Sequence, residues 1–148
     1  MTNKIQDLIN AKSRQEYATT AGRAMHTQMQ HIFYTGHGWV GNANITKRIS
    51  GISELMEYMG VLSRTEVPIA GTVNGKFISR RIDRLYVNND TKKVVVLDYK
   101  TDADKNLFYK KYCEQLTEYY ELLKQIYKGF NIECKILWLG DFTLENII

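Results

Sequence analysis

Three consecutive strand-like segments, with turn signals between them, constrain the fold of this chain more than any other feature. They read TEVPIAG, KFISRRIDRLYV and KKVVVLDYK and lie within residues 65–100. Asn-Gly stands between the first two and Asn-Asn-Asp between the last two, and both sequences are typical of tight antiparallel turns. We therefore expect a meander of three neighbouring strands.

Helical patterns precede the meander. Residues 1–34 carry apolar or small residues at helical spacing, with a break expected from Ser13 to Thr20. The segment ISELMEYMG predicts a short helix that ends at Gly60. Residues 35–51 are rich in glycine, show little periodicity and predict a loop.

A helix and a fourth strand follow the meander. Residues 105–128 have an apolar row at helical spacing, Gly129 ends the helix, and IECKILWLG reads as a strand. The order helix, three strands, helix and strand predicts one α/β domain over residues 1–148, with a mixed sheet of about four strands flanked by helices.

Composition narrows the class of protein. No apolar run approaches the roughly 20 residues that a membrane span needs, and the first residues lack the apolar stretch of a signal peptide. We therefore expect a cytoplasmic chain without a membrane partner. Cys113 and Cys134 are the two cysteines, too few for a disulfide framework or a four-cysteine metal site, so both are expected to be reduced thiols.

The net charge of +4 arises in the first third of the chain. Residues 1–50 hold six basic and two acidic residues, and the remainder is balanced. This basic segment either faces phosphates or forms an ordinary solvated helix surface, and charge alone does not separate the two.

Asp98 and Lys100 are predicted to share one face of the third strand, because residues two apart in a strand point the same way. Taken alone, such a pair is more often a surface salt bridge than a site. The expected register of the meander gives the pair a context.

Turn geometry predicts which residues oppose one another. A two-residue turn at Asn74-Gly75 places Val73 across from Lys76, so the residue numbers of every opposed pair add up to 149. Glu66 then lies across from Asp83. A loop over residues 89–92 makes the numbers of the next opposed pairs add up to 181, which places Asp83 across from Asp98. Pro68 then suits an edge strand, because its missing N–H would point out of the hairpin.

Three carboxylates in a row across a sheet need neutralising, because opposed like charges destabilise it. A hard divalent cation such as Mg²⁺ or Mn²⁺ suits carboxylate oxygens, and Lys100 could orient a metal-bound water. The alternative is a charged, solvated face screened by Arg80, Arg81 and Arg84.

Five short motifs in order resemble the RecB and AddA branch of the PD-(D/E)xK nucleases. They are Gly22 to His26 (G-x-x-x-H), SRTEVPIAG, RRIDRL, VVVLDYKTD and Gln115 to Tyr119 (Q-x-x-x-Y). The resemblance implies a restriction-endonuclease-like core over nearly the whole chain. One departure is Arg81, which stands where relatives commonly have glycine, and this leaves the local backbone geometry in question.

The resemblance also implies a role for individual residues. His26, Asp83, Asp98 and the backbone carbonyl of Tyr99 would bind Mg²⁺, for which Mn²⁺ can substitute, and Lys100 would be the catalytic lysine. Glu66 matches a glutamate of the family whose role is less defined. Without the resemblance, His26 would more often be a hydrogen-bonded core or surface residue.

A third group of residues would contact DNA. Gln115 and Tyr119, four apart on one helix face, would border the site, although they could instead be a packing pair. Arg23, in the basic N-terminal segment, is a further candidate.

The implied activity is Mg²⁺-dependent hydrolysis of DNA, of the exonuclease type, on single-stranded ends during double-strand-break repair. The chain has no G-x-x-x-x-G-K-[ST] loop, so a helicase motor would come from elsewhere in a longer polypeptide or from a partner subunit. Two other functions stay open: an inactive nuclease-fold module that binds DNA, and a stand-alone nuclease for RNA or branched DNA.

Overall fold

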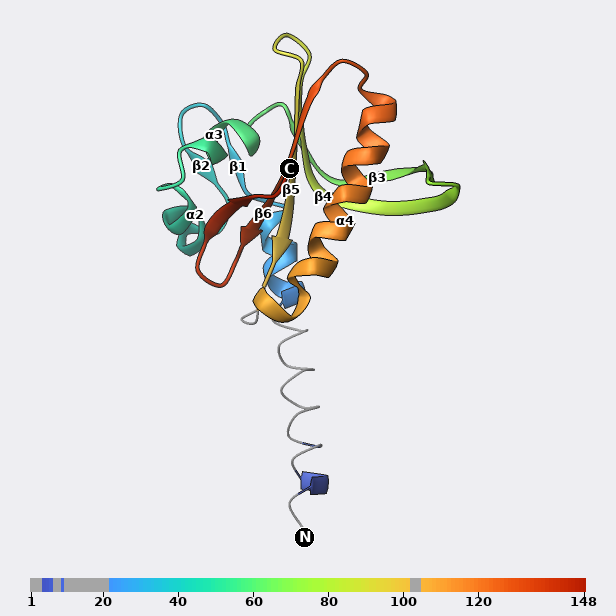
Figure 1. Ribbon diagram of the computed structural model, residues 1–148. Helices are drawn as coiled ribbons and strands as arrows, with labels where there is room; N and C mark the ends of the chain where they lie inside the picture. Colours follow the sequence, from blue (N-terminus) through green and yellow to red (C-terminus); the bar gives the residue numbers. More distant parts are fainter. Residues whose placement is uncertain (1–3, 7–8, 10–21, 102–104) are drawn as a thin grey trace.

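The structure is a computed structural model that describes residues 4–6, 9, 22–101 and 105–148 (Figure 1). Residues 22–29 are helical. The elements that follow are β1 (Phe33–Tyr34), β2 (Trp39–Val40), α2 (Ala43–Ile49), α3 (Glu54–Tyr58), β3 (Ser63–Val73), β4 (Lys76–Asn88), β5 (Lys93–Lys100), α4 (Lys105–Ile126), β6 (Asn131–Trp138) and β7 (Thr143–Asn146).

The central sheet has five strands in the order β3-β4-β5-β6-β7. β5 and β6 are parallel and are joined through α4, and the other neighbours are antiparallel. The expected α/β class with a mixed sheet is confirmed. β3 forms one edge, which is the place that Pro68 requires.

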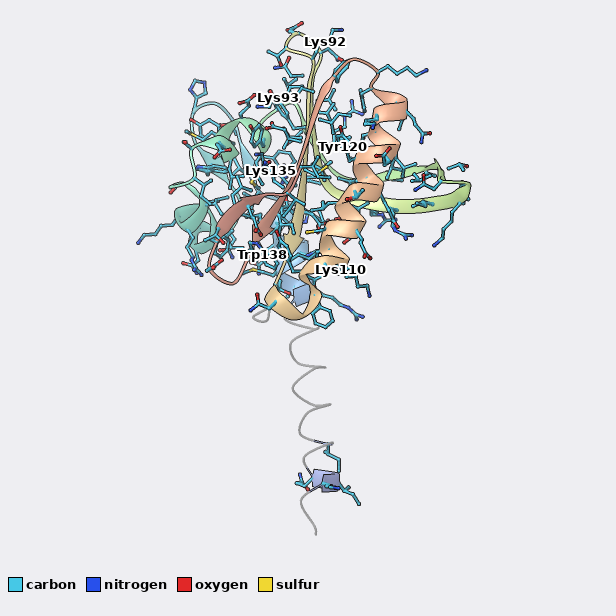
Figure 2. All side chains as sticks on the ribbon, viewed as in Figure 1. Lys92, Lys93, Lys110, Tyr120, Lys135 and Trp138 are labelled. Atoms are coloured by element: carbon cyan, nitrogen blue, oxygen red, sulfur yellow. The ribbon has the colours of Figure 1, made fainter. Side chains whose placement is uncertain are left out.

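The fifth strand, β7, was not predicted. Its sequence, TLEN, is short and has one large apolar residue, so it lacks the alternation by which a strand is recognised. Lys135 of β6 (labelled in Figure 2) holds it by donating from Nζ to Asn146 Oδ1 at 3.1 Å.

Both predicted registers are confirmed. β3 and β4 pair from Val73↔Lys76 to Ser63↔Tyr86, with positions that add up to 149. β4 and β5 pair from Asn88↔Lys93 to Arg84↔Leu97, with positions that add up to 181. Asn74 and Gly75 have φ values of 52° and 77°, as a type I′ turn requires.

Two predictions for the segment before the meander were wrong. Residues 35–51 are not a loop throughout, because they contain β2 and the helix α2, whose N-terminus is capped by the Asn42 side chain. The helix was missed because it is short, is flanked by glycines and has only two buried residues, Ile45 and Ile49, which are four residues apart. The predicted helix also stops early, since Phe33 and Tyr34 form β1. The expected break from Ser13 to Thr20 lies outside the described residues.

The sheet separates two apolar cores. Val95, Leu97 and Tyr99 of β5 pack on the side of residues 22–29, α2 and α3. Val94 and Val96 pack on the other side, against α4. Figure 1 shows α4 and the small elements β1, β2, α2 and α3 on opposite sides of β5. The alternation expected for β5 is therefore confirmed.

β4 extends far beyond its contact with β5. It pairs with β3 along almost its whole length but with β5 only over Arg84 to Asn88. The remainder of β4, together with β3, forms a hairpin arm, residues 67–82, that projects from the sheet beside α4 (Figure 1).

Among the described residues, no helix combines the length and the apolar character needed to cross a membrane.

Candidate active site

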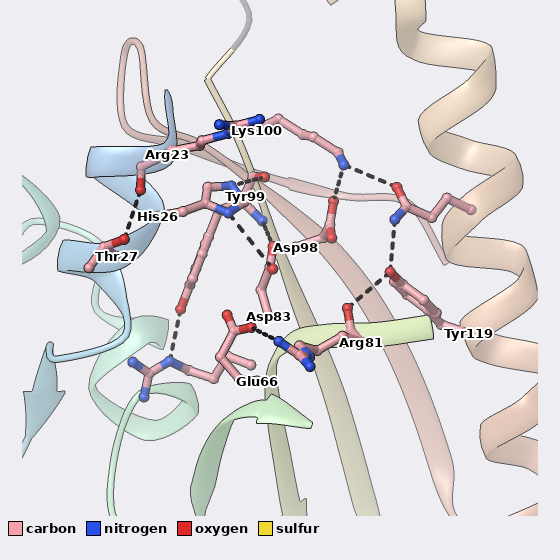
Figure 3. Close-up of polar contacts among 12 residues, drawn as sticks. Arg23, His26, Thr27, Glu66, Arg81, Asp83, Asp98, Tyr99, Lys100 and Tyr119 are labelled. Atoms are coloured by element: carbon pink, nitrogen blue, oxygen red, sulfur yellow. Dashed lines mark hydrogen bonds and ion pairs between the residues drawn. The ribbon is translucent and has the colours of Figure 1, made fainter. Parts of the chain in front are cut away.

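The predicted site residues gather at the fork where β4 turns away from β5 (Figure 3). Asp83 lies one residue beyond the last ladder pair of β4, and Asp98 lies one residue beyond the same pair on β5. His26 comes from the helical residues 22–29, on one side of the sheet, and Gln115 comes from α4, on the other. Both layers of the fold thus contribute to one cluster.

At this fork, the side chains of β4 change the face of the sheet to which they point. Residues two apart in a strand normally share a face. Ile82 nevertheless packs in the core beneath α4, while Arg84 lies in the opposite core. The β3–β4 ladder keeps its register on both sides of this point, yet it lacks a pair between Glu66 and Asp83, both of which are described. The strands reverse their facing there without inserting a residue.

Backbone strain marks the same point. Glu66 has a φ of 54°, a left-handed conformation that non-glycine residues rarely adopt. Three other non-glycine residues of the described chain share a positive φ, and all lie in turns, so Glu66 alone is strained inside a strand. Its carboxylate lies 3.7 Å from Nη1 of Arg81. Glu66 therefore does not simply face Asp83 across a regular ladder, as its register position predicted.

Asp83 is held in a position that disfavours its charge. Its Oδ2 accepts a hydrogen bond from the Tyr99 backbone N–H at 2.8 Å. Burial, and next the nearby Asp98 carboxylate, raise the pKa of Asp83 to about 8. The predicted opposition of Asp83 and Asp98 thus has an electrostatic consequence, because one of the two carries a proton near neutral pH.

Lys100 connects the acidic pair to α4. Its Nζ lies 2.9 Å from Asp98 Oδ2, donates to Gln115 Oε1 at 3.0 Å and sits 4.4 Å from the ring centre of Tyr112. Asp98 is 2% exposed, so this is a buried ion pair and not the surface salt bridge that was the alternative. The ammonium group is fixed from two sides by an acid and an amide.

Gln115 and Tyr119 form the outer part of the same network. Gln115 Nε2 donates to the Tyr119 hydroxyl at 2.8 Å, and that hydroxyl lies 3.4 Å from the Arg81 carbonyl oxygen. Burial, and next Asp98, raise the pKa of the Tyr119 hydroxyl. The pair is near the acids, as expected, but Tyr119 is 1% exposed, so only Gln115 lies at the surface of the site.

His26 approaches the acids from the opposite side. Its Nε2 lies 2.9 Å from the Tyr99 carbonyl oxygen, and its Nδ1 lies 3.9 Å from Asp83 Oδ1. Burial lowers the pKa of the imidazole, and Asp98 and Glu66 partly oppose that effect. The ring is therefore neutral at pH 7, with one nitrogen able to donate a lone pair to a cation.

The donor set can be tested against Mg²⁺. In the part of the chain that the structure describes, no three His, Cys, Asp or Glu side chains converge as a metal-binding group. The 2.9 Å between His26 Nε2 and the Tyr99 carbonyl oxygen is a hydrogen bond in which Nε2 donates, so the lone pair of the ring is on Nδ1, on the side of Asp83. The chemistry of these groups nevertheless suits Mg²⁺, because two carboxylates and the Tyr99 carbonyl supply oxygen ligands and the imidazole supplies one nitrogen.

Arg84 is buried, although its charge suggested a place at the surface. In the alternative of a charged, solvated face it would screen the acids together with Arg80 and Arg81, but it is 0% exposed and lies on the opposite face. Its guanidinium donates to the Tyr99 hydroxyl, to Ser63 Oγ and to the carbonyl oxygens of Met29 and Ile32, at 2.6 to 3.0 Å. Arg84 therefore ties the end of the helix that carries His26 to β4 and β5.

Arg23, the remaining candidate, lies on the same helix as His26, one turn earlier, and is exposed. Figure 3 shows Arg23 on the helix that carries His26. Its side chain makes none of the site's described contacts, and its carbonyl oxygen accepts from Thr27 Oγ1 at 2.9 Å.

Comparison of the chain with models of known protein families and with curated proteins found no match in either case.

Proposed function

We propose that this chain is a Mg²⁺-dependent DNA nuclease of the PD-(D/E)xK type, built on a restriction-endonuclease-like core. The observation that carries the proposal is the arrangement of Asp83, Asp98 and Lys100. The partly buried carboxylate of Asp83 and the buried carboxylate of Asp98 lie close together just beyond the last pair of adjacent strands, and a lysine two residues after the second acid binds it at 2.9 Å. An acid whose pKa is raised to about 8 by burial and by a neighbouring acid is typical of a functional site.

The residues suit a divalent cation in their chemistry. Carboxylate and carbonyl oxygens are the ligands that Mg²⁺ prefers, and a neutral imidazole also accepts Mn²⁺. We assign His26, Asp83, Asp98 and the Tyr99 carbonyl as the ligands. When bound, Mg²⁺ would polarise the scissile phosphate and acidify a bound water. It would also favour the ionised form of Asp83, whose charge is otherwise costly in this position.

Lys100 has the position of a catalytic lysine in this proposal. Asp98 and Gln115 fix its ammonium group, so it can align an attacking water and stabilise the charge that develops on the phosphate. Gln115, at the surface of the site, would contact the DNA strand while it orients Lys100. Glu66 and Arg81 border the site on the side of the hairpin arm.

The setting of this activity follows from the motifs alone. The resemblance to RecB and AddA nuclease modules favours exonucleolytic cleavage of single-stranded DNA ends in double-strand-break repair. A helicase motor in the same polypeptide or in a partner subunit would deliver the strand.

The test is a cleavage assay with labelled single-stranded DNA, duplex DNA and RNA, with Mg²⁺ and with EDTA. The wild type should cleave single-stranded DNA with Mg²⁺ alone, and Asp98→Asn should be inactive. Lys128→Ala, which removes an exposed lysine past the end of α4, is the matched control and should retain full activity. A wild type that binds DNA but cleaves none of the substrates would instead support an inactive DNA-binding module.

A further inference from the structure

The hairpin arm has one covered and one open face. On the covered face, Ile69, Ile78 and Ile82 are buried against α4. Gly71 lies so close that a Cβ there would meet Leu122 Cδ2 at 2.8 Å, and Gln125 of α4 donates to the Thr72 carbonyl oxygen at 2.9 Å. The arm is therefore fixed to α4 along its length.

The open face consists of alternate residues of the two strands, all of them exposed: Pro68, Ala70, Thr72, Phe77, Ser79 and Arg81. Four of these side chains are small, which leaves the backbone accessible. Phe77 is 69% exposed near the tip of the arm, and it is the most exposed aromatic side chain among the described residues. The face of this ring is therefore accessible to a flat group such as a nucleic-acid base.

Charge indicates the chemistry of a partner for this face. Residues 67–82 contain Lys76, Arg80 and Arg81 and no aspartate or glutamate. Arg80 is paired with Glu118 of α4, whereas the side chain of Arg81 is 69% exposed and only loosely paired with Glu66. Lys76 and Arg80 alternate with the open-face residues, so Arg81 is the one basic side chain of that face, and the face has no acid of its own. Together with the exposed ring of Phe77, it suits a polyanion whose bases can stack.

We infer that the open face of the hairpin arm is a track for single-stranded DNA that leads to the fork between β4 and β5. This inference rests on the proposed nuclease function and names the substrate form and its path. Phe77 stacks on a base, and Arg81 contacts a phosphate at the entrance to the site. The small side chains between them let the sugar-phosphate chain lie close to the sheet.

The distance between Phe77, near the tip of the arm, and Asp83, in the site, sets the length of the track. Phe77 and Asp83 are six positions apart in β4, which is roughly 20 Å at about 3.3 Å per residue. A stacked strand rises about 3.4 Å per nucleotide, so the track holds roughly six nucleotides. An oligonucleotide much shorter than that cannot reach Phe77 from the site.

Binding is tested without cleavage, by fluorescence anisotropy of long oligothymidylate in EDTA. Phe77→Ala should raise Kd by at least about fivefold, and Phe77→Trp should restore it, since stacking is worth about that much per base. Arg81→Gln should lower the slope of log Kd against log salt by about 0.7. Val61→Ala removes an apolar residue that is 83% exposed outside the arm, and it should bind like the wild type.

Several binding results would overturn the track. One is a Kd for Phe77→Ala equal to that of the wild type. Another is an equal rise of Kd in Phe77→Ala and Phe77→Trp. A third is a wild type that binds duplex DNA or RNA more tightly than single-stranded DNA. Because Phe77 is exposed, the variants should fold, and circular dichroism checks this.

Cleavage separates this inference from the proposed function. Phe77→Ala should raise KM on long single strands with kcat nearly unchanged, and it should have no effect on oligonucleotides shorter than about six nucleotides. If the wild type cleaves but Phe77→Ala has normal KM on long strands, the track is wrong and the nuclease stands. If the wild type binds through Phe77 but cleaves nothing, the nuclease is wrong and the track stands.

Discussion

Arg84 Nε donates to the Tyr99 hydroxyl at 2.8 Å on the face of the sheet opposite Asp83 and Asp98. Arg84 follows Asp83 in β4, and Tyr99 follows Asp98 in β5. The two acids therefore oppose each other on one face while their next neighbours are bonded on the other. This bond fixes the relative position of the strands just where the β4–β5 ladder ends.

Tyr99→Phe should lower the free energy of unfolding by about 1–3 kcal/mol, because it leaves the buried Arg84 guanidinium with an unsatisfied donor. Chemical denaturation measures this change. Tyr109→Phe is the control, since Tyr109 is exposed and bonds weakly to Glu145 at 3.2 Å, and its effect should stay within about 0.5 kcal/mol. Equal stability of the two variants would mean that the bond contributes nothing.

Lys100→Ala should abolish cleavage while leaving Mn²⁺ affinity nearly intact, because an ammonium group offers no lone pair to a cation. Asp98→Ala should lose both. Calorimetric Mn²⁺ titration and a turnover assay on the two variants separate these roles. Normal turnover by Lys100→Ala would remove the lysine from the mechanism.

The stability of the metal-free protein should fall as pH rises from about 4 to about 8. The pKa of Asp83 is raised in the folded state, so its contribution is full below the unfolded value of 3.8 and is lost as pH rises through about 8. The pKa of His26 is lowered in the folded state, so its contribution to stability rises as pH rises toward 6.5 and opposes that of Asp83. The measurement is therefore the difference between wild type and Asp83→Asn over this range; a constant difference contradicts the assignment.

Glu66→Gly should be more stable than Glu66→Ala by about 1 kcal/mol, because only glycine adopts a φ of 54° without strain. Both variants lose the carboxylate, so the comparison isolates the backbone. If the glutamate also serves catalysis, Glu66→Gly should combine higher stability with lower turnover than the wild type. Thermal unfolding and cleavage assays provide the two values, and an alanine variant as stable as the glycine one would argue against strain.

Removal of the metal by EDTA should stop cleavage, and Mg²⁺ or Mn²⁺ should restore it. Ca²⁺ should bind and inhibit, because its bonds of about 2.3–2.6 Å and looser geometry hold the attacking water poorly. His26→Ala should weaken Mn²⁺ more than Ca²⁺, since imidazole is the better ligand for the transition metal. Activity and affinity curves for the three ions test this, and equal losses for Mn²⁺ and Ca²⁺ would exclude His26 as a ligand.

The register of the meander could be predicted because it depends on local turn chemistry. Asn74-Gly75 specifies a type I′ turn, and that turn sets the pairing of two long strands. The closeness of Asp83 and Asp98 follows from the second turn in the same way. The contact of Lys100 with Asp98 follows instead from the alternation within one strand, in which residues two apart share a face.

The reversal at Glu66 and the burial of Arg84 could not be predicted in this way. The prediction assumes that residues two apart always share a face of the strand. One residue with a left-handed backbone reverses the facing of the side chains without adding a residue, so the sequence carries no sign of it. Arg84 looked like a surface cation because arginine is seldom fully buried. Its burial depends on two carbonyl oxygens at the end of a helix more than fifty residues earlier, a long-range contact that has no local signal.

The DNA cleavage proposed above would depend on both of the apolar cores described earlier. His26 enters the fork from one layer and Gln115 from the other, so neither layer alone carries a complete set of groups. A chain that has folded only one side of its sheet would hold the acids without the groups that orient them. Such an intermediate should be harmless to nucleic acid, and hydrolytic activity should report directly on completed folding.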